Sequence, residues 1–292
     1  MTLLILGGGG MLGHKLWQTA APRMTTWVTM RGDGSALPDT FDRSRIVGGV
    51  HAEQFDTVVR AFELVRPDVV VNCLGVVKQR ADAADPLVAL TVNGVFPHRV
   101  AALCAAAGSR LVHISTDCVF SGQRGGYVET EPPDAIDLYG RTKHLGEVSG
   151  PGCLTLRTSI IGRELATSRG LVEWFLGTDG IVPGYTHAVF SGVTTAELSR
   201  VILRVIAEHP ALAGVYHVAA EPISKHDLLV RLNVALGRGA TIRPDPSVRI
   251  DRSLDGRRFA AAASYAAPPW DRMIEELSAD VPAYETWRQH AR

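Results

Sequence analysis

Two residues four positions apart, Tyr139 and Lys143, have the types and spacing of a proton-transfer pair. In a helix, side chains at i and i+4 share one face. A tyrosine hydroxyl has an ordinary pKa of about 10, and a neighbouring ammonium lowers that pKa because it favours the phenolate. Such a tyrosine can exchange a proton near neutral pH. The same spacing is common on ordinary surface helices, so a second signal is needed.

That second signal is a polar segment 23 residues before Tyr139, where Val112–Phe120 reads VHISTDCVF. Its apolar start predicts a strand over 110–115, so hydroxyl side chains follow at the strand's carboxyl end. The Thr116 hydroxyl could hydrogen-bond a substrate carbonyl oxygen while Tyr139 supplies the proton. Asp117 could bind a substrate hydroxyl or simply cap a turn, and the sequence leaves both roles open.

A glycine-rich turn near the start of the chain predicts a dinucleotide pocket. The apolar run Thr2–Leu6 precedes four glycines, and a helical pattern starts at Met11. Glycines let the backbone approach a pyrophosphate, and the helix N-terminus attracts its negative charge. The spacing is ambiguous, because Gly8, Gly10 and Gly13 fit G-x-G-x-x-G while Gly7, Gly10 and Gly13 fit G-x-x-G-x-x-G. Together with the tyrosine and lysine, this turn predicts hydride transfer with a nicotinamide cofactor.

Strands and helices must alternate to position these residues. The pattern predicts strands over 2–6, 25–30, 45–47, 68–72, 110–115 and 153–157, and helices over 53–65, 86–107 and 138–148. The long helix would end at Gly108, a suitable C-cap. This order is typical of an α/β fold with a Rossmann-type, doubly wound parallel sheet, which binds ligands at the carboxyl ends of its strands.

The rhythm changes after about residue 160. We expect helices over 195–206, 225–236 and 270–277 and a strand over 215–219, among frequent glycines, prolines and aromatic residues. The predicted division is an NAD(P)-binding Rossmann domain over 1–160 and a smaller, mainly substrate-binding lobe over 161–292. Some segments of that lobe could return to the Rossmann sheet.

Composition excludes several other classes of protein. The 292 residues carry 30 basic and 30 acidic side chains, which argues against a general nucleic-acid or anionic-membrane binder. The four cysteines lack metal-ligand spacing, as do the histidines, so we expect no metal and a reducing compartment. The apolar N-terminus is too short for a signal peptide, and no stretch approaches a membrane span. A cytoplasmic location follows from these expectations.

Cofactor choice depends on the end of the second predicted strand. An acidic residue there would bind both ribose hydroxyls and repel a 2′-phosphate. The strand ends at Met30, and Arg31 follows with a guanidinium that suits phosphate. Asp33 would argue for NAD(H), but Gly32 and Gly34 around it indicate a turn. We therefore expect NADP(H) rather than NAD(H).

These segments together resemble the extended short-chain dehydrogenase/reductase family, and within it the dTDP-4-dehydrorhamnose reductases and related nucleotide-sugar reductases. The resemblance covers nearly the whole chain. It is carried by the glycine turn, by Thr116 to Phe120 and Tyr139 to Lys143, and by later segments that read LRTS from Leu156, FSGVTT from Phe190 and RSLD from Arg252.

The resemblance implies roles for individual residues. Thr116, Tyr139 and Lys143 would form the catalytic set, and Asn93 would support the site from behind. The implied cofactor-binding residues are Gly7, Gly10, Met11, Leu12, Gly13, Arg31, Asn72, Cys73, Leu74, Gly75, Asn93, Tyr139 and Lys143. The implied substrate-binding residues are Lys78, Asp117, Cys118, Arg157, Phe190 and Arg252. The family also implies a nucleotide-sugar substrate and a homodimer.

Three departures from the family pattern bear on the substrate. Cys118 stands where the rhamnose reductases carry tyrosine, and Leu6 replaces the usual threonine before the first glycine. Lys78 enters a segment that is usually small and alanine-rich; it could pair with a substrate phosphate or hydroxyl, or be a solvated loop charge. Arg157 could reach the substrate phosphates or tie two lobes by an ion pair. Hydride chemistry is left intact, but rhamnose itself is in question.

Three functions remain open on the sequence. The first is an NADP(H)-dependent reductase of a nucleotide-linked 4-keto (deoxy)sugar, similar to dTDP-4-dehydrorhamnose reductase. The second is a nucleotide-sugar epimerase that retains its cofactor. The third is a non-catalytic regulatory relative, and the intact set of Thr116, Tyr139 and Lys143 argues against it.

Overall fold

The chain folds into two compact units in a computed structural model that describes residues 1–35, 37–78 and 84–290. Unit 1 comprises Met1–Thr116, Ile136–Leu156 and Ser199–Val215. Unit 2 comprises Asp117–Ala135, Arg157–Leu198 and Tyr216–Arg292. Each unit is therefore assembled from separated segments. The functional division at residue 160 stays a prediction.

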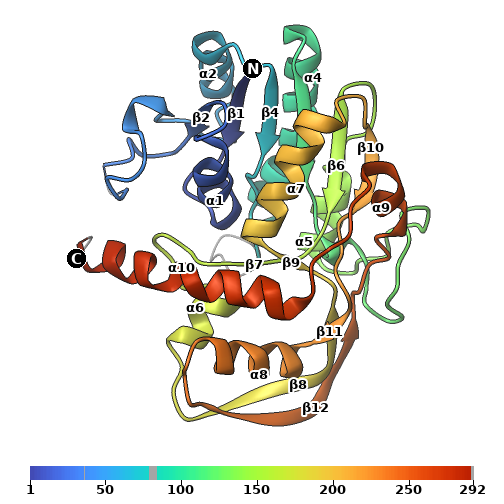
Figure 1. The fold of residues 1–292 in the computed structure, drawn as a ribbon. Coiled ribbons are helices and arrows are strands. Elements are labelled where there is room, and N and C mark those ends of the chain that lie inside the picture. The colour runs from blue at the N-terminus through green and yellow to red at the C-terminus, as the bar shows by residue number, and fades with distance from the viewer. Residues whose placement is uncertain (36, 79–83, 291–292) are drawn as a thin grey trace. The chain divides into compact units, whose positions relative to one another are not determined.

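A seven-stranded sheet organises the fold (Figure 1), with the order β10-β6-β5-β4-β1-β2-β3. Neighbouring strands from β6 to β3 all pair in parallel. This confirms the predicted Rossmann-type sheet, whose order reverses beside β1 as in doubly wound folds. The strands are β1 (Thr2–Leu6), β2 (Thr25–Thr29), β3 (Ile46–Val47), β4 (Val69–Asn72), β5 (Arg110–Ile114), β6 (Cys153–Arg157) and β10 (Gly214–His217).

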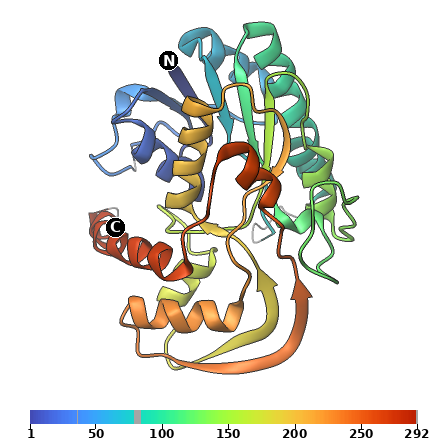
Figure 2. The same ribbon diagram turned by 45° about the vertical axis from the view of Figure 1, so that its right-hand side comes forward.

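Helices of unit 1 cover this sheet because each has an apolar stripe. On one face, α2 (Phe55–Val65) and α4 (Phe96–Ala107) share a core with β1, β4 and β5, which includes Leu4, Phe62, Val70, Phe96 and Leu111. The figures show α7 (Thr195–Glu208) along the other face, near α1 (Met11–Ala20) (Figures 1 and 2). Unit 1 also contains α5 (Leu138–Leu145), which is shorter than the predicted 138–148.

The predicted helix over 86–107 is interrupted by a π-helical segment. The chain forms α3 (Pro86–Ala89), the π-helix η3 (Leu90–Val95) and then α4, which ends at Gly108 with φ +69°. The left-handed C-cap at Gly108 is confirmed. Asp85 caps the start by accepting from the Leu87 amide at 2.8 Å. π-Helical turns inside helices occur frequently at functional sites, and this one carries Asn93.

The same segment corrects one expectation. Pro86–Ala107 spans 22 residues with a hydropathy of 1.4, so by length and composition it could cross a membrane. About half of it, 44% of the hydropathy window, is buried inside the protein. Phe96, Val100 and Cys104 pack into the core of unit 1, as in the core helices of globular proteins. Length and hydropathy alone therefore do not assign this helix to a membrane.

Unit 2 contains a three-stranded sheet that the sequence pattern did not reveal. Its order is β11-β8-β12, with β8 (Ile181–Phe190) parallel to β12 (Thr241–Asp251) and antiparallel to β11 (Ile223–Ser224). Figure 2 shows the two long strands side by side, and α8 (Lys225–Ala235) packs against them. Prolines such as Pro183 and Pro244 break the alternating pattern of both long strands, and so disguise them in the sequence.

The other elements of unit 2 are short apart from one helix. A two-stranded sheet pairs β7 (Ile160–Ile161) with β9 (Val193–Thr194). The helices are α6 (Leu171–Leu176), α9 (Arg257–Ala263) and α10 (Trp270–His290). The last helix is much longer than the predicted 270–277, and Pro282 lies inside it. Helix α8 and strand β10 lie close to the ranges expected for them.

Candidate active site

The glycine turn between β1 and α1 has the shape of a phosphate cradle. Gly7 has φ +93°, and a Cβ on Gly13 would collide with the Gly7 carbonyl oxygen. The Gly10 amide donates to that same oxygen at 3.1 Å. A Cβ on Gly8 would likewise collide with the Val28 side chain, so the turn is compatible with both glycine spacings. Since no side chain caps the amides that open α1, an anion such as pyrophosphate fits this turn.

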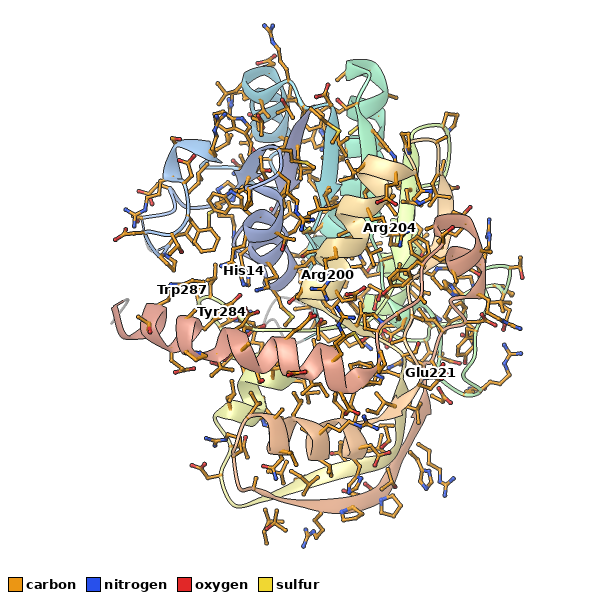
Figure 3. The ribbon with its side chains drawn as sticks, in the orientation of Figure 1. His14, Arg200, Arg204, Glu221, Tyr284 and Trp287 are labelled. Atoms are coloured by element: carbon orange, nitrogen blue, oxygen red, sulfur yellow. The ribbon has the colours of Figure 1, made fainter. Side chains whose placement is uncertain are left out.

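Buried polar contacts hold the turn in place. Thr29, at the end of β2, accepts hydrogen bonds from the Gly7 amide through Oγ1 at 3.2 Å and from the Gly8 amide through its carbonyl oxygen at 2.9 Å. His14, labelled on α1 in Figure 3, is fully buried, and its Nδ1 lies 2.7 Å from the Gly10 carbonyl oxygen. The sequence analysis did not single out His14.

Tyr139 and Lys143 lie on α5, as predicted, and Lys143 ties that helix to the sheet. Its Nζ donates to the Ile114 carbonyl oxygen, the last residue of β5, at 2.7 Å. The side chain is buried, with 5% exposure. Burial lowers the pKa of Lys143 to about 8, and Glu147 opposes this shift. The tyrosine-bearing helix is therefore fixed at the carboxyl end of β5.

Thr116 follows directly from that strand end and is buried. The neighbouring Ser115 donates through Oγ to Glu147 Oε1 at 2.7 Å, which joins the same strand end to the segment just after α5. Thr116, Tyr139 and Lys143 thus belong to one unit. Tyr139 and Lys143 lie on α5, and Thr116 lies in the segment that follows β5. Their catalytic roles remain predictions.

Asn93, on the π-helical segment, connects three parts of unit 1. Its side-chain oxygen accepts from the Val76 amide at 2.9 Å, and its Nδ2 donates to the Val76 carbonyl oxygen at 3.0 Å. Nδ2 also lies 3.4 Å from the Thr142 hydroxyl on α5. Asn93 therefore holds the segment after β4 beside the helix of Tyr139, which fits the supporting role expected for it.

Asn72 shapes the segment Cys73–Gly75. Its Oδ1 accepts from the Leu74 amide at 3.0 Å, and its Nδ2 donates to His113 Nδ1 at 3.1 Å. Burial lowers the pKa of His113 well below its ordinary value, so this ring is neutral and can accept that bond. Burial also raises the pKa of the Cys73 thiol to about 12. His113 is a positioning residue that the sequence analysis missed, although the strand pattern places it opposite Asn72.

Lys78 lies at the far end of this segment, beside the start of α5. Its Nζ is 2.7 Å from Asp137 Oδ2 and 5.5 Å from the centre of the Tyr139 ring. Asp137 also caps α5 by accepting from the Gly140 amide at 2.8 Å. The Lys78 ammonium therefore forms an ion pair and is not simply a solvated loop charge. Its contact with substrate stays a prediction.

Arg31 is exposed just after β2, where the sequence expected it. Its carbonyl oxygen accepts from the Gly49 amide at 3.2 Å. The Ser35 amide donates to Asp33 Oδ1 at 2.9 Å, and this bond lowers the pKa of Asp33. Together with Gly34 at φ +80°, it forms the turn expected around Asp33, whose carboxylate is engaged locally.

In unit 2, Asp117 and Cys118 open a single 3₁₀ turn, Asp117–Val119. Asp117 is buried, and its amide donates to the Thr158 carbonyl oxygen at 3.1 Å. Cys118 is half-buried and is not part of a disulfide. The turn geometry of Asp117 is therefore established, while its contact with a substrate hydroxyl stays a prediction.

Arg157 ends β6 with a buried side chain. Its Nη1 lies 3.2 Å from His217 Nε2, and its guanidinium stacks over the Phe120 ring at 5.2 Å. His217 in turn reaches the Tyr127 carbonyl oxygen through Nδ1 at 3.1 Å. These contacts favour a packing role for Arg157 within unit 2. Its reach to substrate phosphates stays a prediction.

Phe190 ends β8 and Arg252 follows the end of β12, and the Arg252 amide donates to the Val189 carbonyl oxygen at 3.0 Å. Arg252 Nε donates to the Phe120 carbonyl oxygen at 3.0 Å. The sequence analysis missed a third member, Lys225, whose Nζ lies 3.7 Å from the centre of the Phe190 ring. Burial lowers the pKa of Lys225, against the attraction of Asp117 and Cys118. A lysine opening a helix gave no signal in the sequence.

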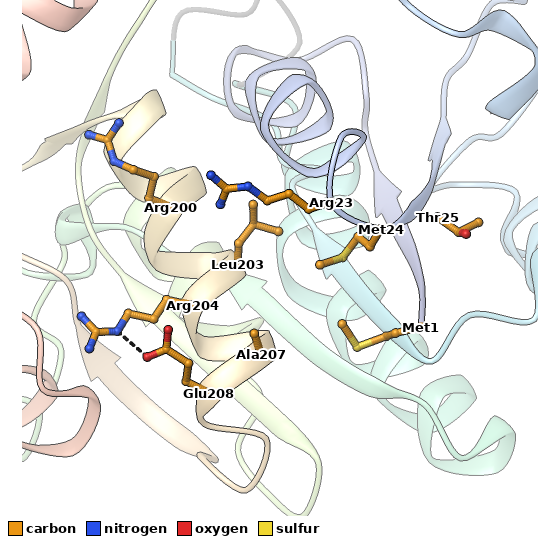
Figure 4. A pocket seen from close by; sticks show the side chains of 9 residues that line it. All are labelled: Met1, Arg23, Met24, Thr25, Arg200, Leu203, Arg204, Ala207 and Glu208. Carbon is orange, nitrogen blue, oxygen red and sulfur yellow. Dashed lines mark hydrogen bonds and ion pairs between the residues drawn. The ribbon is translucent and has the colours of Figure 1, made fainter.

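A separate cavity of about 810 Å³ lies in unit 1 at the amino ends of β1 and β2 (Figure 4). None of the predicted site residues lines it. Its lining residues are Met1, Arg23, Met24, Thr25, Arg200, Leu203, Arg204, Ala207 and Glu208. Within 1–35, 37–78 and 84–290, no three His, Cys, Asp or Glu side chains gather as a metal site would require.

The parallel sheet, the glycine turn and the Tyr139–Lys143 pair at the strand ends define a Rossmann-type short-chain dehydrogenase/reductase. Residues 1–175 match the family described as RmlD substrate binding domain, and the chain belongs to that family. The expected resemblance to dTDP-4-dehydrorhamnose reductases is thereby confirmed.

Individual relatives agree with this assignment. A dTDP-4-dehydrorhamnose reductase of Mycolicibacterium smegmatis is 27% identical, over 96% of this chain and 85% of the relative. The reductase of the same name from Shigella flexneri is 25% identical, over 95% and 98% of the two chains. A crystal structure of dTDP-4-dehydrorhamnose reductase from Bacillus anthracis in complex with NADP superposes with a TM-score of 0.79. That structure is 20% identical and covers 96% of this chain and 99% of its own, so it supports the fold.

Proposed function

We propose that this protein is an NADP(H)-dependent reductase of a nucleotide-linked 4-keto (deoxy)sugar. The observation that carries the proposal is the hydrogen bond from Lys143 to the Ile114 carbonyl oxygen, because it fixes the helix of Tyr139 at the strand end that continues into Thr116. The dTDP-4-dehydrorhamnose reductases among its relatives supply the class of substrate. The glycine turn fits a dinucleotide, since no side chain caps the amides that open α1 and only glycine at position 13 lets the helix approach the Gly7 backbone.

When bound, the nicotinamide cofactor supplies a hydride to the carbonyl carbon of the sugar. Tyr139 donates its proton to the carbonyl oxygen, so that the ketone becomes a hydroxyl group. Thr116 holds that oxygen by a hydrogen bond, and Lys143 favours the phenolate that Tyr139 leaves behind. Asp117, Cys118, Phe190, Lys225 and Arg252 of unit 2 would bind the sugar nucleotide.

The experiment is a substrate panel followed by the loss of NADPH absorbance. We expect oxidation of NADPH with dTDP-4-dehydrorhamnose or another 4-keto nucleotide sugar, and none with free sugars. Cofactor that stays bound through purification, with interconversion of sugars without added NADPH, would instead identify an epimerase. Binding of nucleotide sugars without turnover of any of them would favour a regulatory protein.

The preference for NADP(H) rests on Arg31. This exposed guanidinium follows β2, while the nearby Asp33 is engaged with the Ser35 amide. A charge-assisted bond is worth roughly 1.5–3 kcal/mol, or about 10- to 150-fold in affinity. Arg31→Ala should therefore weaken NADPH binding by that order and leave NADH binding unchanged. Fluorescence titration of both cofactors measures this, with Arg60→Ala as a control; equal losses for both cofactors would contradict the assignment.

We further propose a cytoplasmic homodimer. Leu87, Val95 and Leu145 of unit 1 are exposed, and Leu145 lies beside Gly94, so part of the α3–α5 surface offers apolar area to a second copy. The four cysteines form no disulfide, which suits a reducing compartment. Light scattering should give twice the 31.4 kDa chain mass, and Val95→Asp should reduce it to the monomer. A monomeric wild type at micromolar concentration would reject this assembly.

A further inference from the structure

Lys78 is an exposed loop residue, yet its ammonium makes two specific contacts. It is bonded to the residue that caps the helix of Tyr139, and its charge lies beside the tyrosine ring. We propose that Lys78 is a positioning residue for Tyr139. It forms a clamp, the ion pair with the helix-capping residue Asp137, and this clamp keeps the tyrosine ring in place at the carboxyl ends of the strands. This inference rests on the proposed function, in which Tyr139 is the proton donor.

The two carboxylate oxygens of Asp137 accept different hydrogen bonds. Oδ1 accepts from the Gly140 amide at 2.8 Å and so satisfies one of the open amides of the first turn of α5. Oδ2 accepts from Lys78 Nζ at 2.7 Å. A carboxylate held on both sides cannot rotate without breaking a charged bond. The first turn of α5, which carries Tyr139, is therefore anchored to the segment after β4.

The opposite side of the segment is anchored as well. Asn93 makes two hydrogen bonds to the Val76 backbone, at 2.9 and 3.0 Å, only two residues before Lys78. Asn93 is itself buried. The backbone close to Lys78 is thus held in place, and the Lys78 side chain links this backbone to the helix-capping residue Asp137.

The ammonium also acts on the ring directly. At 5.5 Å from the ring centre, Lys78 is within the range of a cation–π contact, which is weak at an exposed site. Lys143, on the same helix, reaches the sheet by donating to the Ile114 carbonyl oxygen. The lysine in contact with the Tyr139 ring is thus the exposed one, with a side chain about 37% accessible, whereas Lys143 is buried.

A double-mutant cycle tests the clamp. Lys78→Met removes the ammonium, and Asp137→Asn keeps an oxygen for the Gly140 amide but removes the charge. We expect each variant to lower kcat about 3- to 10-fold, as for an exposed ion pair combined with a weak ring contact, with KM within twofold. The double variant should be no worse than either single one. Lys78→Arg should restore most of kcat, and Arg60→Met, from the exposed Arg60–Asp56 pair on α2, should change nothing.

A direct titration separates this inference from the proposed function. The absorbance of phenolate near alkaline pH, taken as the difference between each protein and its Tyr139→Phe form, reports Tyr139 with no substrate. We expect Lys78→Met to raise the pKa of Tyr139, because a nearby cation is lost. If no 4-keto sugar is reduced, the proposed function fails, while this titration still tests the clamp.

Three results would overturn the clamp. An unchanged Tyr139 titration in Lys78→Met would mean that the ammonium does not act on the ring. Additive losses in the double-mutant cycle would mean that Lys78 and Asp137 act separately. A raised KM with unchanged kcat would mean that Lys78 binds substrate directly rather than positioning Tyr139.

Discussion

Lys143 in unit 1 and Lys225 in unit 2 are both lysines whose pKa is lowered by burial, yet the protein holds them differently. Lys143 Nζ donates to the Ile114 carbonyl oxygen at 2.7 Å. Lys225 Nζ rests 3.7 Å from the centre of the Phe190 ring. A carbonyl oxygen fixes the direction of one N–H bond, whereas a ring attracts the charge and leaves the N–H bonds free to turn.

The residues around each lysine repeat this difference. In unit 1, three side-chain oxygens accept hydrogen bonds from backbone amides, those of Asn72, Asn93 and Asp137. These directional bonds hold the backbone around Tyr139 in a defined position. In unit 2, the Lys225 ammonium lies against the Phe190 ring, and the Asp117 carboxylate attracts it. We infer that the first region aims groups at a reacting atom, and that the second holds charge beside a ligand whose shape can vary.

The variant Tyr139→Phe is the strongest test of this difference between the two regions. If the region in unit 1 serves chemistry, removal of one hydroxyl should lower kcat about 10²- to 10⁴-fold, the usual contribution of a general acid. NADPH affinity and KM should change little, because the aromatic ring and the rest of α5 stay in place. Tyr185→Phe, at a half-exposed tyrosine of β8, serves as the control. Near wild-type turnover in Tyr139→Phe would remove Tyr139 from the mechanism.

The charge state of Lys143 gives a second test, through stability. Its folded pKa of about 8 lies below the ordinary 10.5. Between these values the unfolded chain binds more protons, so the free energy of unfolding rises with pH through that window and falls as pH drops toward 8. At 1.36 kcal/mol for each pKa unit, the change is about 3 kcal/mol.

Lys143→Met lacks this titration, so the stability of wild type relative to the variant should increase by about 3 kcal/mol from pH 7.5 to pH 10.5. Urea unfolding of the ligand-free proteins at several pH values measures it. Lys15→Met, at a partly exposed lysine of α1, is the matched control. A stability difference that does not change with pH would mean that the Lys143 ammonium remains hydrated in the folded protein.

The two regions also differ in how far the sequence predicts them. The sheet of unit 1 follows from apolar runs such as Val69–Val71 and from the glycine turn, because buried parallel strands and phosphate turns have strong local patterns. Tyr139 and Lys143 were found from their helical spacing. The clamp on Asp137 was not, since it joins residues 59 positions apart.

Unit 2 shows the opposite case. Strands β8 and β12 carry Pro183 and Pro244, which mask the alternation of a strand. Phe190 and Arg252 were proposed only through the family resemblance. Lys225 was missed because its significance comes from the pairing of β11 with β8, which sets Ser224 opposite Val189 and brings the lysine to Phe190. Long-range register of this kind leaves no mark on a single segment.

A smaller effect than these two is expected from Lys225, and it tests the contrast from the side of unit 2. If this lysine binds a ligand, Lys225→Met should raise the KM for the nucleotide sugar roughly 10- to 50-fold. This is the lower part of the range for a charged hydrogen bond, and we expect it because the Lys225 side chain is only partly buried. Since it orients no reacting group, kcat and NADPH affinity should stay within twofold. Lys225→Arg should recover part of the affinity, and Arg231→Met, at an exposed ion pair on the same helix, should match wild type. A fall in kcat at unchanged KM would place Lys225 with the residues that aim the chemistry, and the difference between the two regions would be lost.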